Sequence, residues 1–192
     1  MPLLKETEKE SYTYADVLEW DESFRAEIID GKVYMMGSPT TFHQRISRAL
    51  FLKIGNFLEG KSCEVFAAPF GVRLFPKDDD SDNTFVEPDI VVVCDASKLD
   101  DRGCNGAPDL VIEILSPSTA GNDCVAKFNN YLKAGVREYW ILDSETRTVQ
   151  VHILDQGKYT TAVYEADEKK TEPIPISVLP GCEIDLQTIF VN

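Results

Sequence analysis

Glu113 is a charged residue inside an apolar run, because residues 110–115 read Leu-Val-Ile-Glu-Ile-Leu and predict a buried strand. A second apolar run, 90–93, directly follows Asp89. Side chains alternate across a strand, so each acid shares a face with valines, and the two converge if the strands are neighbours. Two buried carboxylates repel each other unless a cation compensates them, and hard oxygen ligands suit Mg²⁺. The pair therefore predicts a divalent metal site.

A lysine follows within reach of this pair. Lys127 comes fourteen residues after Glu113, in the first turns of a predicted helix. A helix packed across the sheet can point its long side chain back at the carboxylates. An ammonium placed there can orient an attacking water or stabilise an oxyanion. Glu27, in a predicted hairpin strand, and His43, near the start of a long predicted helix, are further candidates for the same site.

Each candidate also has a purely structural interpretation. Asp89 follows a proline and can simply begin a strand or form a turn. Lys127 can pair with an acid one helical turn earlier, a surface contact of about 0.3–0.5 kcal/mol. His43 can lie at the edge of the core, and Glu27 can be an exposed strand residue. Glu113 is the hardest to explain in this way, since charged residues are almost never fully buried without a partner.

Helix signals come first among the elements that must position these residues. Thr13 and Asp16 form a capping box, which predicts a helix start. Ser38 followed by Pro39 predicts the N-cap and first residue of a longer helix. Gly135 is typical of the position just after a helix end. With apolar residues at helical spacing, these signals predict helices at 13–20, 40–59 and 122–134.

The strand signals predict a single α/β domain. Asp30-Gly31 is a strong hairpin-turn dipeptide and predicts two short strands within 26–37. Further strands are predicted at 63–75, 87–94, 108–115, 137–143, 148–154 and 158–164, with a polar loop at 76–85 and a turn with a short helix near the C-terminus. We expect one domain over 1–192 with a mixed, strongly curved sheet, residues 1–12 being a flexible tail.

The net charge of −14 argues against a simple nucleic-acid binder, because phosphate contacts need Lys and Arg. The charge is uneven, with −6 over residues 77–102 and +3 over 41–61. The acidic stretch is typical of a solvated surface that maintains solubility. The basic stretch offers Arg45, Arg48 and Lys53 as candidate contacts to a nucleic-acid backbone.

The composition suggests neither a membrane nor a secreted protein. No apolar run approaches the roughly 20 residues that a membrane helix needs, and the first ten residues lack the apolar stretch of a secretory signal. The five cysteines are scattered without CxxC spacing. We therefore expect reduced thiols, no zinc site and a cytoplasmic protein.

Several segments resemble one known family. The segments "EPDIVVV", "PDLVIEILSPST" and "KAGVREYWILD", with Asp123, Lys127 and Tyr131 between the last two, are similar to the Uma-two family, a branch of the PD-(D/E)xK nuclease-like superfamily. The segments "AEIIDGKVYMM" and "LPGCEIDL" and the position of His43 extend the resemblance over about residues 25–190. The resemblance implies an α/β (α+β) fold with a restriction-endonuclease-like core, in which a curved mixed sheet is flanked by helices, with an N-terminal helix and hairpin.

The resemblance also implies roles for individual residues. Asp89 and Glu113 would be metal-binding acids, and Glu27 an additional acid. In the usual superfamily pattern the lysine follows the glutamate by two residues, where this chain has Leu115. Lys127 would then supply the ammonium from the helix, as the Uma-like pattern is commonly interpreted.

Two functions of different classes follow. The first is a Mg²⁺- or Mn²⁺-dependent endonuclease that hydrolyses DNA phosphodiester bonds, with His43 as a further substrate contact. The second is a nuclease-like module that binds or assembles without cleaving, which the −14 charge and Leu115 favour. We expect DNA as a partner, no membrane association, and consider a homodimer.

Overall fold

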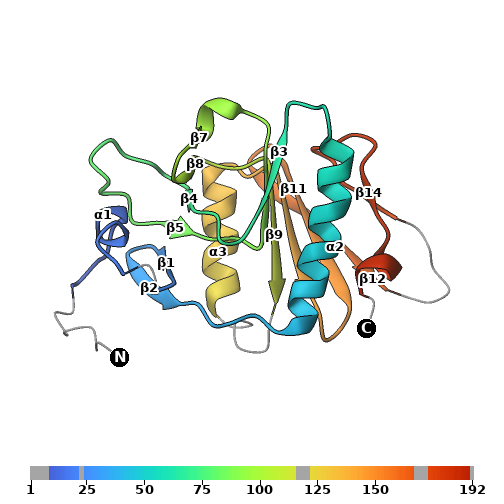
Figure 1. The fold of residues 1–192 in the computed structure, drawn as a ribbon, viewed down its shortest axis with the longest axis horizontal. Coiled ribbons are helices and arrows are strands. Elements are labelled where there is room, and N and C mark those ends of the chain that lie inside the picture. The colour runs from blue at the N-terminus through green and yellow to red at the C-terminus, as the bar shows by residue number, and fades with distance from the viewer. Residues whose placement is uncertain (1–8, 22–23, 116–121, 167–172, 191–192) are drawn as a thin grey trace.

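A computed structural model of the chain describes residues 9–21, 24–115, 122–166 and 173–190, with only the backbone described at 122–124. Figure 1 shows two long helices, α2 (Thr41–Leu58) and α3 (Asn122–Ala134), on either side of a sheet that contains β9 (Leu110–Leu115). The shorter helical elements are α1 (Tyr14–Val17), η1 (Ala96–Lys98, a 3-10 turn) and α4 (Leu186–Ile189).

The sheet between the long helices has the strand order β12-β11-β10-β9-β6-β3. Its strands are β3 (Glu64–Ala67), β6 (Ile90–Val93), β9 (Leu110–Leu115), β10 (Glu138–Asp143), β11 (Thr148–Asp155) and β12 (Lys158–Glu165). Strands β9 and β10 are parallel, and the other neighbours are antiparallel. A parallel pair needs a crossover connection, and α3 is that crossover, so it packs across the strand that it leaves.

The two faces of this sheet pack against different elements. Ile112 of β9 lies in one core cluster with the apolar side of α2. Val111 of β9 and Val91 of β6 lie in the other cluster, with Tyr131 of α3. Glu113 contacts Tyr131 and is therefore on the same face as Val111, as the alternation predicted.

A second six-stranded sheet, in the order β2-β1-β5-β4-β8-β7, adds to the core on the α3 side. Its strands are β1 (Ala26–Ile29), β2 (Lys32–Met35), β4 (Val72–Arg73), β5 (Phe85–Val86), β7 (Leu99–Asp100) and β8 (Gly103–Asn105). Ile29 and Val72 of this sheet share a core cluster with Val91 of the first. A small third sheet pairs β13 (Ile174–Pro175) with β14 (Glu183–Ile184).

The mixed α/β architecture is as predicted, but the strands form two large sheets where one was expected. The segment 63–75, predicted as one strand, is interrupted between Ala67 and Val72. Pro69 lies in this interval and has no N–H to donate to a ladder. The chain crosses here from the first sheet to the second. The elements η1, β5, β7, β8, β13 and β14 were not predicted, and β5 begins at the end of the segment 76–85 that was expected to be a loop.

The helix signals at Thr13–Asp16 and at Gly135 were correct, but the first helix ends at Val17 and does not continue to residue 20. The Thr13–Asp16 capping box is present, and α3 covers 122–134 with Gly135 at a positive φ of 86°. Helix α2 begins later than predicted, because Thr40 is the N-cap: its hydroxyl accepts a hydrogen bond from the His43 N–H at 3.1 Å. None of the described helices combines the length and apolar composition needed to cross a membrane.

The expectation that all five cysteines are reduced thiols is wrong, because Cys63 and Cys94 form a disulfide. Cys63 directly precedes β3 and Cys94 directly follows β6, and these strands pair with Glu64 opposite Val93. Continuing that antiparallel register by one residue brings the cysteines together, a proximity that a sequence separation of 31 does not reveal. Cys104 and Cys182 are buried free thiols, and the side chain of Cys124 lies outside the described residues.

Candidate active site

Asp89 and Glu113 meet where β6 and β9 pair. The antiparallel register places Ile90 opposite Ile112, so one further step places the two acids opposite each other. The Ile114 N–H donates a hydrogen bond to Asp89 Oδ2 at 2.7 Å and fixes that carboxylate. The predicted adjacency of the two strands is confirmed.

Lys127 points from α3 into the same place. Its Nζ lies 2.8 Å from Glu27 Oε1, 2.7 Å from Glu27 Oε2 and 3.1 Å from Glu113 Oε1. Lys127 is 8% exposed and Glu27 3% exposed, so neither is the surface residue that the structural interpretation required. Asp123, the acid one turn earlier, has its side chain outside the described residues. Lys127 thus joins two carboxylates that come from different sheets.

Two further groups hold these carboxylates in place. The Tyr131 hydroxyl, one turn after Lys127 on α3, donates to Glu113 Oε1 at 2.6 Å. The Glu87 N–H donates to Glu27 Oε1 at 2.9 Å. The carboxylates of Glu27 and Glu113 are therefore oriented by hydrogen bonds as well as by the Lys127 charge.

His43 approaches Asp89 from α2. Its Nε2 lies 3.1 Å from Asp89 Oδ1, the carboxylate oxygen that Ile114 does not bond. Burial lowers the pKa of His43, but the hydrogen bond to Asp89 and the Asp89 charge outweigh burial and raise it above its ordinary value. His43 is thus buried and contacts a carboxylate of the cavity, whereas the structural interpretation placed it at the edge of the core.

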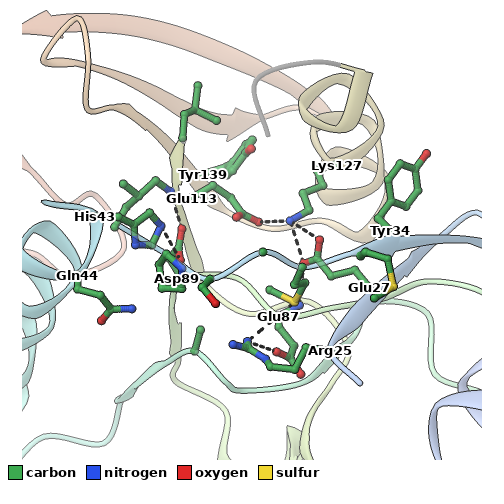
Figure 2. A pocket seen from close by; sticks show the side chains of 18 residues that line it. Arg25, Glu27, Tyr34, His43, Gln44, Glu87, Asp89, Glu113, Lys127 and Tyr139 are labelled. Carbon is green, nitrogen blue, oxygen red and sulfur yellow. Dashed lines mark hydrogen bonds and ion pairs between the residues drawn. The ribbon is translucent and has the colours of Figure 1, made fainter. Parts of the chain in front are cut away.

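One cavity of about 150 Å³ is lined by all five sequence candidates for the catalytic site, and Figure 2 shows it from close by. They are Glu27, His43, Asp89, Glu113 and Lys127. Helix α3 contributes Lys127, β9 contributes Glu113, α2 contributes His43, and β1 contributes Glu27. The rest of the lining comes from the hairpin and the residue before it, the 36–39 segment, α2 and residues in or beside other strands: Arg25, Tyr34, Met35, Met36, Gly37, Ser38, Pro39, Gln44, Ala68, Glu87, Ile114, Leu115 and Tyr139.

The cavity concentrates negative charge. Burial is the main reason that the pKa of Glu113 is raised to about 7, and the carboxylates of Glu27 and Asp89 raise it further, against the opposing effect of Lys127. Glu113 therefore keeps its proton to a higher pH than an ordinary glutamate does. A buried carboxyl whose pKa lies near the working pH, with a specific charge partner in a cleft, is typical of a functional site.

The donor set fits a magnesium-type ion. Among the described residues, no three His, Cys, Asp or Glu side chains are placed to enclose a metal ion together. Mg²⁺ does not need such a cage, since it keeps several waters and binds through one or two carboxylates plus substrate phosphates. Asp89 and Glu113 both place carboxylate oxygens, which are hard ligands, in one cavity. The negative charge of Asp89 contributes to the raised pKa of Glu113, and a bound cation would offset that charge.

The predicted nucleic-acid contacts lie elsewhere. Arg45, Arg48 and Lys53 are exposed on α2, and none of them lines the cavity. Two charged lining residues were not among the sequence candidates, Arg25 and Glu87. Each lies two positions before a candidate acid, Glu27 and Asp89 respectively, so strand alternation would have placed them on the same side.

Comparisons with known proteins identify the family and the fold of the chain. Residues 14–187 match the model of a family, Uma2, described as "Putative restriction endonuclease". Two proteins of Synechocystis sp., the uncharacterized proteins slr1290 and sll1609, are each 29% identical, over 80% and 68% of this chain and 80% and 74% of their own lengths. A crystal structure described as a putative nuclease belonging to DUF820, from Anabaena variabilis, superposes with a TM-score of 0.73, at 22% identity, over 93% of this chain and 97% of that one. That likeness shows a shared fold.

Proposed function

Because the chain belongs to the Uma2 family, whose model spans residues 14–187, we propose that it is a Mg²⁺- or Mn²⁺-dependent endonuclease that hydrolyses DNA phosphodiester bonds. One observation carries the proposal: the Glu113 carboxylate and the Lys127 ammonium, from a strand and the helix that follows it, meet in a cavity that Asp89 also lines. Two acids can hold a divalent ion and an amine can stabilise developing charge, and metal-assisted phosphate hydrolysis uses both effects.

Asp89 and Glu113 are the residues that would hold the ion. When bound, it would act as a Lewis acid, neutralising charge on the phosphate and lowering the pKa of a water. Asp89 is preorganised for this role, because Ile114 and His43 each contact one of its oxygens. Glu113 has one oxygen engaged by Tyr131 and Lys127, which fixes the orientation of its carboxylate.

Lys127 takes the place of the lysine expected on the strand. Leu115 lines the cavity at the strand position but has no charge to offer. The ammonium enters from α3 instead, and Glu27 holds it with both oxygens. In that position it can orient the attacking water or stabilise charge on the phosphate as the transition state forms.

A cleavage assay tests the proposal directly. The full chain is incubated with plasmid, linear duplex and single-stranded DNA in the presence of Mg²⁺, Mn²⁺ or EDTA. We expect cleavage that needs the ion and disappears in Glu113→Ala. The matched control is Glu145→Ala, which removes an exposed acid outside the cavity and should cut at the wild-type rate. Cleavage that persists in EDTA or in Glu113→Ala would contradict the proposal.

The alternative is a nuclease-like module that binds or assembles without cleaving. The net charge of −14 and the engagement of Lys127 by two carboxylates favour it. It predicts that DNA, or a second copy of the chain, is bound while every DNA substrate stays intact with either ion. Homodimer formation and a cytoplasmic location stay predictions, and sedimentation of the purified chain would test the first.

A further inference from the structure

We propose that Arg25 binds a backbone phosphate of the polynucleotide whose neighbouring phosphodiester is cleaved, an inference that rests on the proposed nuclease function. Arg25 directly precedes β1 and lines the cavity that contains Glu113 and Lys127. Its carbonyl accepts a hydrogen bond from the Met36 N–H at 3.0 Å, which ties its backbone to the segment after β2.

Arg25 is the accessible cation of the cavity. Its side chain is 40% exposed, against 10% for Lys127 and 10% for His43. A strand of nucleic acid that reaches the cavity from solvent would therefore meet the guanidinium before it meets the deeper ammonium. The lining also contains four acids, namely Glu27, Glu87, Asp89 and Glu113. A polyanion can enter such a lining only where a cation offsets these charges.

The guanidinium of Arg25 has unused donors. One nitrogen, Nη2, donates to Glu87 Oε2 at 2.6 Å and to Met36 Sδ at 3.9 Å. Its Nε is buried and has no hydrogen-bond partner among the described residues. A guanidinium carries five N–H donors in a fork that matches phosphate geometry, and a buried donor without a partner is costly. A phosphate oxygen has the right charge and shape for the solvent-exposed part of this fork, while Nε itself is enclosed by the protein.

Glu87 connects this cation to the Lys127 network. Its carboxylate accepts from Arg25, while its backbone N–H donates to Glu27, the acid that holds Lys127. Figure 2 shows Arg25 and Lys127 on opposite sides of Glu27. The two cations are therefore held by different acids, so each can contact a different phosphate of one strand.

The test measures steady-state cleavage of DNA with Mg²⁺ over a range of KCl concentrations. Arg25→Gln should raise KM about 10-fold or more, with kcat close to that of the wild type, because a charged hydrogen bond made in the bound ground state is lost. The slope of log(kcat/KM) against log[KCl] should become shallower by about 0.7–0.9, as for one lost phosphate contact. Arg137→Gln is the matched control, since Arg137 also pairs with a carboxylate, Asp109 at 3.0 Å, but lies outside the cavity.

Glu87→Gln separates substrate binding from a structural role. This variant keeps the backbone N–H that holds Glu27 and releases Arg25 from its carboxylate partner. The proposal predicts an unchanged or lower KM. If Glu87→Gln raises KM as Arg25→Gln does, or if Arg25→Gln keeps the wild-type KM and salt slope, Arg25 does not bind phosphate although the nuclease function stands. If the wild type cleaves no DNA, both proposals fail.

Discussion

Lys127 and Glu113 are 3.1 Å apart, although one is on a helix and the other on a strand. The contact exists because α3 is the crossover between the parallel strands β9 and β10, and therefore packs back across the strand that it leaves. A second carboxylate, Glu27, reaches the same ammonium from the other large sheet. The site thus depends on the packing of both sheets against α3.

The raised pKa of Glu113 predicts a pH-dependent stability. The carboxyl titrates near 4.5 when unfolded and near 7 when folded, so between these values the folded state binds more protons, and this group's contribution to stability falls as pH rises. Glu113→Gln mimics the protonated form and should lose this dependence. We define the difference as the melting temperature of Glu113→Gln minus that of the wild type, both measured in EDTA. This difference should increase by several degrees from pH 4.5 to pH 8, because each kcal/mol of stability shifts the melting temperature of a chain of this size by about 2–4 °C.

Thermal melts across this pH range check the prediction. A difference between variant and wild type that stays constant with pH would contradict the raised pKa. A variant that is destabilised at pH 8 would instead indicate that Glu113 is mainly a structural partner of Lys127.

Tyr131→Phe should impair turnover more than stability. The substitution removes the hydroxyl that fixes Glu113 Oε1 at 2.6 Å and leaves the ring in the core. Partners that orient a metal-binding carboxylate typically contribute about 10- to 100-fold in activity or metal affinity, and we expect a loss of that size. Tyr159→Phe is the matched control, since that hydroxyl donates to the Val136 carbonyl at 2.9 Å, outside the cavity. Equal cleavage by both variants would contradict a positioning role for Tyr131.

Metal binding should require the two converging acids. We expect calorimetric titration to show Mg²⁺ or Mn²⁺ binding to the wild type and its loss in the Asp89→Asn/Glu113→Gln double variant. Near pH 7 binding should also release protons, since the ion favours the charged form of Glu113. The control removes two exposed acids, Asp79 and Asp95, by substitution to Asn. Equal affinity in all three proteins would place the ion elsewhere.

The sequence predicted the centre of the site because local rules determine it. Strand alternation placed Asp89 and Glu113 on one face of two adjacent strands, and β6 and β9 do pair. Gly135 marked the end of α3, which fixed the helix that carries Lys127.

Features that depend on distant pairing were not predictable in this way. The division into two sheets follows from the interruption between Ala67 and Val72, and the Cys63–Cys94 disulfide follows from the register of β3 and β6. The ion pair of Arg25 with Glu87 also joins residues that are 62 positions apart in the sequence. Such contacts arise from tertiary packing, which periodicity in a single sequence does not report.

In the proposed mechanism, the Lys127 ammonium acts on the water or the phosphate while the carboxylates hold the ion. Lys127→Ala should therefore lower metal-dependent DNA cleavage by about 100-fold or more, with metal affinity largely intact, because the lost interaction is made mainly in the transition state. Lys127→Arg should not restore the rate well, since a planar guanidinium differs in shape from a compact ammonium.

The most direct measurement is the single-turnover cleavage rate of Lys127→Ala with saturating Mg²⁺, next to Lys133→Ala, which removes an exposed lysine from the same helix. If Lys127 has the proposed role, Lys133→Ala should cut at the wild-type rate and Lys127→Ala should show no cleavage above the EDTA control. A Lys127→Ala protein that cuts DNA as fast as the wild type would contradict the account.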